Sequence, residues 1–139
     1  MRVLGLDIGK KRTGVAISDE AGLVATPLRT IKSSGRRSLL RAITEIIKEY
    51  DVGEIVLGLP LNLNGSEGPR AREARDFAAA LQQATGLTVR CWDERFSTAA
   101  VTRVLLEADL SRARRREVVD KSAAAYILQG FLESRRNGP

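Results

Sequence analysis

The stretch VLGLDIGKKRTGVAISD, residues 3–19, decides the fold class. Within residues 2–8 the apolar residues run together without alternation, which is typical of a strand buried on both faces of a sheet. GKKRTG (9–14) predicts a turn and VAISD (15–19) a second strand. Asp7 lies inside the first strand, where a carboxylate loses hydration on folding and needs compensation. Such a residue is either a hydrogen-bonded strand-end group or a ligand for a cation or a phosphate-bound metal.

The rest of the chain continues this pattern. After a tight turn at 20–22, residues 23–31 predict a third strand, so the chain begins as an antiparallel meander. Helix and strand patterns then alternate: a helix with its apolar face from Leu39 to Tyr50, a strand at 54–59, a loop at 60–70, a helix at 71–85 that stops at Gly86, a strand at 87–92, a capped helix within 97–108, a polar connector at 109–116 and a last helix at 117–135. We expect an α/β fold in one domain over 1–139, with a mixed five-stranded sheet flanked by helices, an order shared by the ribonuclease H-like fold.

Composition narrows the chemistry. The net charge is +6 without any histidine, so the excess is permanent at neutral pH and favours a polyanionic partner, nucleic acid before an anionic membrane surface. A histidine-based triad and histidine metal ligands are excluded. Cys91, the single cysteine, forms no disulfide within the chain and is predicted to be a core residue, as are Trp92 and Tyr126. No apolar run is long enough to cross a bilayer, and we expect a cytoplasmic protein without a membrane partner.

Two further acidic positions share the unusual placement of Asp7. Asp93 and Glu94, in RCWDERFST, end the fifth predicted strand, and Asp120 lies on the same helical stripe as the apolar residues Ala124, Ile127 and Phe131. Each has an ordinary interpretation when taken singly. Asp7 could accept hydrogen bonds from the turn, Asp93 or Glu94 could be solvated, and Asp120 could match the helix dipole.

Taken together, the acids predict a site. The carboxyl ends of parallel strands form the natural cleft of an α/β sheet, and Asp7 and Glu94 both lie at such ends. Converging carboxylates repel each other unless cations bind, and Mg²⁺ or Mn²⁺ prefers carboxylate and water ligands. Two such ions can activate a water and stabilise the leaving oxygen in phosphodiester hydrolysis.

The sequence resembles the YqgF/RuvX family of Holliday junction resolvases, also described as pre-16S rRNA nucleases. The matching segments are LGLDIGKKRTGVAISD, GLPLNLNGSEGP, DERFST and VDKSAAAYIL, which are spread over residues 4–128. The resemblance implies a ribonuclease H-like fold and a divalent-metal nuclease that acts on branched DNA or an rRNA precursor. Carried over to this sequence, it implies Asp7, Glu94 and Asp120 as the catalytic, metal-binding acids.

One departure from the wider resolvase and ribonuclease H pattern concerns the second acid. Those enzymes commonly carry an acid near the end of the fourth strand, but VLGLPLNLN offers none. With a sheet order of 3-2-1-4-5, strand five would lie about 9–10 Å from strand one. A glutamate reaches further across that gap than an aspartate, so we favour Glu94, while Asp93 stays open because strand alternation does not decide between them.

Basic and polar side chains surround the predicted acids. The turn beside Asp7 and the positions around Glu94 and Asp120 carry the residues that we expect to contact phosphates, namely Lys10, Lys11, Arg12, Arg95, Arg112, Arg114, Arg115 and Arg116. The loop at 61–70 is expected to overhang the cleft, with Asn62, Asn64 and Ser66 available to a backbone or a metal-bound water. A solvated hairpin tip and a solvated charged face are the alternatives.

Two other functions start from the same features. Actin-like and sugar-kinase-like ATP-binding folds also begin with a strand, Asp-x-Gly, a turn and a second strand, although they need two lobes and this chain is short. A non-catalytic ribosome-assembly protein could keep the fold and the charge. The sequence contains no base-reading motif that selects RNA or DNA, and it allows a monomer or a homodimer.

Overall fold

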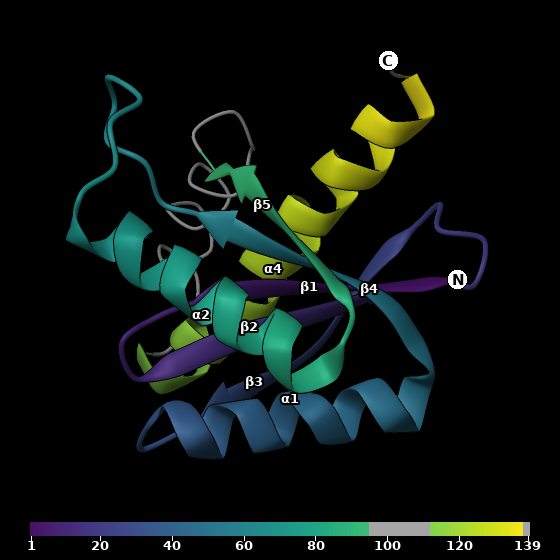
Figure 1. Ribbon diagram of the computed structural model, residues 1–139, viewed down its shortest axis with the longest axis horizontal. Coiled ribbons are helices and arrows are strands. Elements are labelled where there is room, and N and C mark those ends of the chain that lie inside the picture. Colours follow the sequence, from purple (N-terminus) through teal and green to yellow (C-terminus); the bar gives the residue numbers. More distant parts are fainter. Residues whose placement is uncertain (95–111, 138–139) are drawn as a thin grey trace.

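The computed structural model describes the backbone of residues 1–94 and 112–137, and the side chains of 1–94 and 121–136 (Figure 1). Its centre is the predicted mixed five-stranded sheet, in the order β3-β2-β1-β4-β5 that was assumed above for the distance between strands one and five. β1 pairs antiparallel with β2, β2 pairs antiparallel with β3, and β4 lies parallel to both β1 and β5. The strands are β1 (Arg2–Ile8), β2 (Arg12–Ser18), β3 (Ala25–Lys32), β4 (Val52–Leu59) and β5 (Thr88–Asp93).

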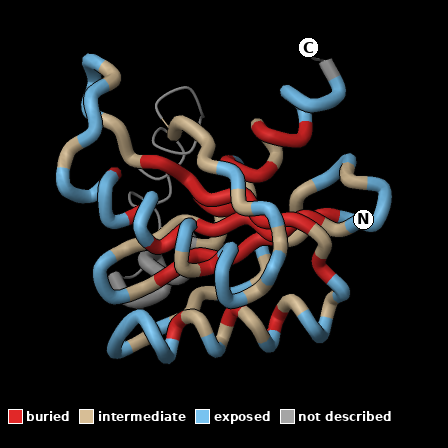
Figure 2. Tube along the Cα trace, in the orientation of Figure 1, coloured by how far each residue is buried: buried red, intermediate tan, exposed pale blue. Residues whose placement is uncertain are grey.

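Helices cover both faces of this sheet (Figures 1 and 2). The described helices are α1 (Arg36–Tyr50), α2 (Pro69–Thr85) and α4 (Arg112–Asn137). Leu4 and Leu6 of β1 belong to the cluster that α1 and α2 cover, whereas Val3 belongs to the cluster that α4 covers. β1 is therefore buried on both faces, which explains why its apolar residues do not alternate with polar ones.

Most element boundaries agree with the sequence patterns, and two differ. The first turn is shorter than predicted because β2 already begins at Arg12, and the Gly9 N–H donates to the Arg12 carbonyl at 2.9 Å. The prediction of a polar connector at 109–116 was wrong for residues 112–116, because these residues form the first turns of α4. Arginine is a strong helix former, so a run of arginines extends a helix. The helix predicted within 97–108 lies outside the described residues.

Helix α4 packs tightly on β1 because β1 carries a glycine beneath it. A Cβ on Gly5 would lie 2.7 Å from the Cβ of Leu128 and 3.1 Å from the carbonyl oxygen of Ala124. The buried alanines 123 and 124 complete this close contact. Ala124 thus lies over β1, and Asp120 precedes it by one helical turn.

An ionic cluster links the C-terminal end of α4 to strands β4 and β5. The Glu54 side chain is buried, with the residue 5% exposed, and accepts hydrogen bonds from Arg90 at 2.6 Å and Arg135 at 2.5 Å. Arg135 also lies over the Phe131 ring, 4.5 Å from its centroid. Burial raises the pKa of Glu54, but the hydrogen bonds and charges of Arg135 and Arg90 outweigh it and hold the pKa below the ordinary value of 4.5.

Glu54→Gln is expected to lower the free energy of unfolding by about 2–3 kcal/mol at neutral pH, somewhat less than for a fully buried pair because both arginines are half-exposed. A lowered folded-state pKa means that this stabilisation is present above the unfolded-state pKa and is lost as pH falls through the folded-state pKa. Urea unfolding from neutral to acidic pH should show that loss in the wild type and not in the variant. Glu45→Gln, an exposed change on α1, is the control, and equal effects of the two changes would contradict the assignment.

Three predicted core residues have different outcomes. Cys91 and Trp92 are partly buried against the two clusters, and the Trp92 and Phe131 rings meet edge-on at 6.0 Å. Burial raises the pKa of the Cys91 thiol, which keeps it protonated at neutral pH. Tyr126 is 42% exposed, so its core assignment was wrong: it lies next to the buried stripe of α4 and lines a groove against β3.

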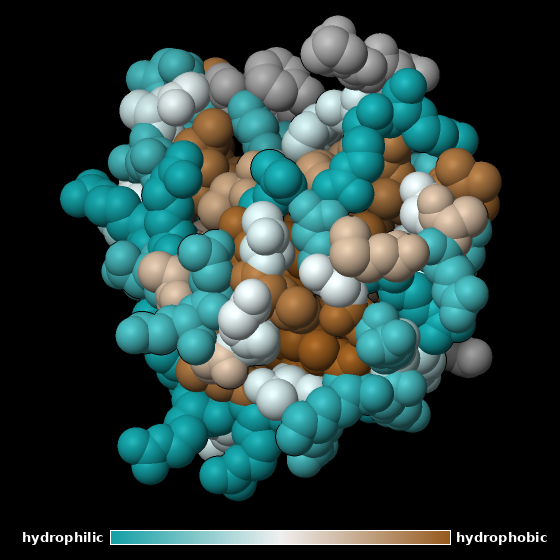
Figure 3. Space-filling model, turned by 45° about the vertical axis from the view of Figure 1, so that its right-hand side comes forward, coloured by the Kyte–Doolittle hydropathy of each residue, from teal (hydrophilic) through white to brown (hydrophobic). Residues whose placement is uncertain are grey.

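The outer surface of the fold is largely polar. On the face that Figure 3 shows, hydrophilic residues occupy most of the periphery and apolar ones gather near the middle. Within residues 1–94 and 112–137, no helix combines the length and the apolar character that a bilayer crossing requires.

Candidate active site

Strand alternation places Asp7 on the α4 face of the sheet. Val3 belongs to the cluster beneath α4, and the open side of Gly5 faces Leu128 of that helix. Asp7 is two residues further along the same strand and is half-buried near the carboxyl end of β1. It therefore lies at the edge of the sheet that was predicted to hold the acids.

Glu94 extends over the neighbouring strand on that same face. A Cβ on Gly58 of β4 would lie 3.1 Å from both Cγ and Cδ of Glu94, and 2.7 Å from Cδ1 of Ile127 in α4. The glutamate thus crosses from β5 to β4 through the space that a Gly58 side chain would fill. Because β4 lies between β1 and β5, about one strand spacing of ~4.8 Å remains between this position and β1.

Asp93 belongs to the other face of the sheet by alternation. Trp92 packs against Phe131 of α4, while Cys91 packs against the cluster under α1 and α2. Asp93 shares the alternation of Cys91, so it projects from β5 away from the α4 face. The geometry associates Glu94, and not Asp93, with the side of the sheet on which Asp7 lies.

Asp120 lies in the described backbone of α4, but its side chain is outside the described residues. Its helical neighbours Ala124 and Ile127, four and seven positions later, are both fully buried against the sheet. Among the described side chains, no three acids, histidines or cysteines are grouped closely enough to hold a metal.

The oxygen atoms of these carboxylates indicate which metals the site could bind. Carboxylates are hard oxygen ligands, and the chain has no histidine to complete a zinc or copper site. Asp7 and Glu94 on one face, with the Glu94 side chain extended over Gly58 toward β1, fit a hard divalent ion such as Mg²⁺ or Mn²⁺.

The structure describes the side chains of only some of the residues that were predicted to contact phosphates. Lys10 and Lys11 are exposed at the tip of the β1–β2 hairpin, directly after the strand that carries Asp7, and Arg12 is half-buried. Arg112, Arg114, Arg115 and Arg116 lie on the first turns of α4, without described side chains, and Arg95 lies outside the described residues.

The loop at 60–68 projects from the carboxyl edge of the sheet (Figure 1). Its polar side chains bond to one another: Asn62 donates to the Ser66 hydroxyl at 3.0 Å, which donates to Asn64 at 2.6 Å. These bonds brace the loop and raise Leu63, 96% exposed, at its tip. Asn62, Asn64 and Ser66 therefore use part of their hydrogen-bonding capacity within the loop.

Gly58 is the site residue that sequence reasoning missed. A glycine inside a buried strand often marks a close approach of another group, and here that group is Glu94. The strand-four acid of the wider resolvase pattern is absent, and the fifth-strand acid instead reaches over strand four.

Gly58→Ala is expected to lower the rate of any reaction that depends on Glu94 by tenfold or more, since a new Cβ displaces its side chain, and to destabilise the fold by about 1–3 kcal/mol. Adding Ile127→Val removes the Cδ1 atom that clashes, and should restore stability but not the rate. Thermal unfolding and single-turnover rates of both variants test this. Recovery of the rate together with stability would show that the position of Glu94 is unimportant.

Comparisons with known proteins support one family. A sequence model described as "RuvX: Holliday junction resolvase" matches residues 1–134. A Myxococcus xanthus protein named "Putative pre-16S rRNA nuclease" is 54% identical over 136 residues, covering 98% of this chain and 90% of the relative. A Moorella thermoacetica protein of the same name is 53% identical over 133 residues, covering 96% and 95%.

Solved structures share the fold at low identity. Thermus thermophilus RuvC in complex with a Holliday junction substrate has a TM-score of 0.62 and 15% identity, over 99% of this chain and 97% of that one. Fowlpox virus resolvase with Holliday junction DNA has a TM-score of 0.59 and 14% identity, over 97% and 99%. Both similarities establish the ribonuclease H-like fold.

Proposed function

The chain belongs to the RuvX family, and from this membership we propose that it is a divalent-metal-dependent endonuclease that hydrolyses phosphodiester bonds in structured nucleic acid. The observation that carries the proposal is the placement of the Glu94 side chain over Gly58, on the face of the sheet that holds Asp7. Two carboxylates at the carboxyl edge of the sheet, in a chain of net charge +6, suit a polyanionic substrate and a cationic cofactor.

In this proposal Asp7, Glu94 and Asp120 hold Mg²⁺ or Mn²⁺. The bound ions would supply an acidified water for attack and charge stabilisation for the leaving oxygen. The three carboxylates fix where the scissile phosphate sits. Asp7 contributes from a rigid central strand, and Gly58 leaves the space through which Glu94 reaches β4.

Phosphate contacts outside the acids would hold the substrate. Lys10, Lys11 and Arg12 follow Asp7 directly, so they are suited to the phosphates next to the scissile one. Arg95 and the arginines of the first turns of α4 (Arg112, Arg114, Arg115 and Arg116) are proposed to bind further phosphates.

A 16S rRNA precursor is the first candidate substrate, because relatives above 50% identity are named putative pre-16S rRNA nucleases, and its 5′ end is the part that we propose to be processed. A Holliday junction is the second, because the description of the matching family names it. Action on an rRNA precursor would place the protein in the cytoplasm. A monomer suffices for one cut, whereas paired cuts at a junction favour a homodimer.

Cleavage of both substrates side by side, by the wild type and by Asp7→Asn, tests the proposal. The expected result is Mg²⁺-dependent cutting of one substrate by the wild type and none by Asp7→Asn. Normal growth and rRNA maturation in cells that carry only Asp7→Asn would favour the non-catalytic assembly role. Nucleotide binding without any cleavage would favour the ATP-binding alternative.

A further inference from the structure

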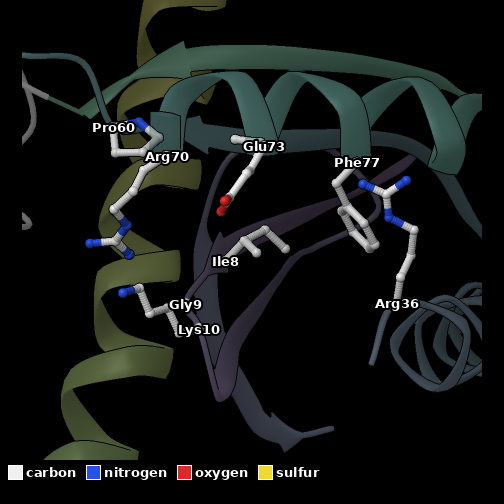
Figure 4. Close-up of a pocket in the computed structure, with 9 residues that line it drawn as sticks. Ile8, Gly9, Lys10, Arg36, Pro60, Arg70, Glu73 and Phe77 are labelled. Atoms are coloured by element: carbon white, nitrogen blue, oxygen red, sulfur yellow. The ribbon is translucent and has the colours of Figure 1, made fainter. Parts of the chain in front are cut away.

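A second basic site lies on the opposite face of the sheet from the acids. A pocket of about 210 Å³ opens between the end of β1 and the beginnings of α1 and α2. Its charged lining residues are Lys10, Arg36, Arg70 and Glu73, and its apolar wall includes Ile8 and Phe77. Lys10 and Arg70 extend toward each other on one side, Arg36 lies on the other side beside Phe77, and Glu73 projects between them (Figure 4).

Lys10, Arg36 and Arg70 line this pocket without an ion-pair partner among the described side chains, and Glu73 is the acid among its charged lining residues. Among the side chains of residues 1–94 and 121–136, no carboxylate lies within ion-pairing distance, 4.0 Å, of Lys10, Arg36 or Arg70. Other arginines on the same surface do find partners, as Arg75 does with Glu67. Three positive charges against one negative charge leave the pocket net positive, and a bound anion would offset that charge.

The helix ends add to the same preference. Arg36 and Arg70 lie in the first turns of α1 and α2, where no acid is present and where Gly35 and Gly68 provide no side-chain cap. Cations at a helix N-terminus oppose the macrodipole, and the uncapped N–H groups there favour an anion. Two such ends meet at one pocket that also carries Lys10 from the hairpin after Asp7.

We propose that the Lys10–Arg36–Arg70 pocket binds a non-scissile phosphate of the nucleic-acid substrate. This inference rests on the proposed function. The hairpin carries Lys10 from the edge at which Asp7 lies to the α1/α2 face, so a strand cut at the acids continues around the end of β1 into the pocket. The ligand is a phosphodiester group read by charge, without base contacts.

Direct binding tests this site without cleavage. The affinities of a labelled four-way DNA junction and a labelled RNA duplex are measured across a salt series, in chelator, for the full chain. The Arg36→Ala/Arg70→Ala variant should bind at least one of them roughly tenfold more weakly, and its slope of log affinity against log salt should shrink by up to about 0.9 per lost contact on duplex DNA. Glu73→Gln, which removes the acid of the pocket, should tighten binding.

The matched control is Arg37→Ala/Arg72→Ala, which removes the same charge from neighbouring exposed positions of the same helices and lines no part of the pocket. Equal weakening by both double variants would overturn the pocket in favour of overall charge, and no weakening by either would also overturn it. The pocket could instead bind a free phosphate ion, and calorimetry with inorganic phosphate distinguishes that ligand from the phosphate of a nucleic-acid backbone. Phosphate binding that Arg36→Ala/Arg70→Ala abolishes, with unchanged polynucleotide affinity, would assign the pocket to a small phosphate and overturn the backbone site.

Cleavage by the same proteins separates this inference from the proposed function. The pocket variant should raise KM and leave kcat within about twofold, since it removes binding away from the acids. A wild type that never cleaves but shows the expected affinity differences would retain the pocket and refute the nuclease. If the wild type cleaves, and the pocket and control variants bind substrate equally well, the nuclease is retained and the pocket is refuted.

Discussion

Asp7→Asn is expected to lower the single-turnover rate of cleavage by at least about 10³-fold, because loss of a carboxylate that is proposed to bind the metal forfeits several kcal/mol of transition-state stabilisation. The change is isosteric and lies near the end of a strand that is anchored by the buried side chains of Val3, Leu4 and Leu6, so the fold should persist. If the three proposed acids converge, removing one of their negative charges should leave the Tm equal or higher in the absence of metal.

The control for Asp7→Asn is Asp76→Asn, an exposed change on α2 that removes the same charge. Substrate affinity, measured in chelator, should be nearly the same for both variants. A rate for Asp7→Asn within tenfold of the wild type would remove Asp7 from the catalytic acids.

Glu94→Gln is expected to reduce the cleavage rate by about 10²-fold or more, while Asp93→Asn should change it by less than about threefold at temperatures where both are folded. The two residues are adjacent and carry the same charge, but only the Glu94 side chain lies over Gly58 on the face of Asp7. Single-turnover rates and thermal unfolding of the two variants make the comparison. A larger loss of rate in Asp93→Asn would reverse the assignment.

The sheet could be read from the sequence because each strand has a local signature. Three signals depend on neighbours within a few positions: the apolar residues that run together in 2–8, the short strand at 54–59, and the helix stop at Gly86, whose φ is 73°. The start of α4 was misplaced because an arginine run fits a solvated connector and a helix equally well.

The parts of the site that escaped prediction depend on contacts between distant segments. The longer reach of a glutamate favoured Glu94 from the sequence, but Asp93 stayed open, because only the packing shows that Trp92 faces α4 and that Gly58 leaves space beneath Glu94. The basic pocket joins Lys10, Arg36 and Arg70 only after α1 and α2 pack on the sheet. No local pattern marks such convergence, since each arginine alone looks like an ordinary surface charge.

The dependence of cleavage on metal tests the central claim most directly. Single-turnover cleavage by the wild type is measured with Mg²⁺, with excess chelator, and after Mg²⁺ or Mn²⁺ is restored, on the substrate that the side-by-side assay selects. Because the chain has no histidine to act as a general base in place of the ion, activity should vanish in chelator and return with either metal. Cleavage that persists at its full rate in excess chelator would contradict the assignment of Asp7, Glu94 and Asp120 as metal-binding acids.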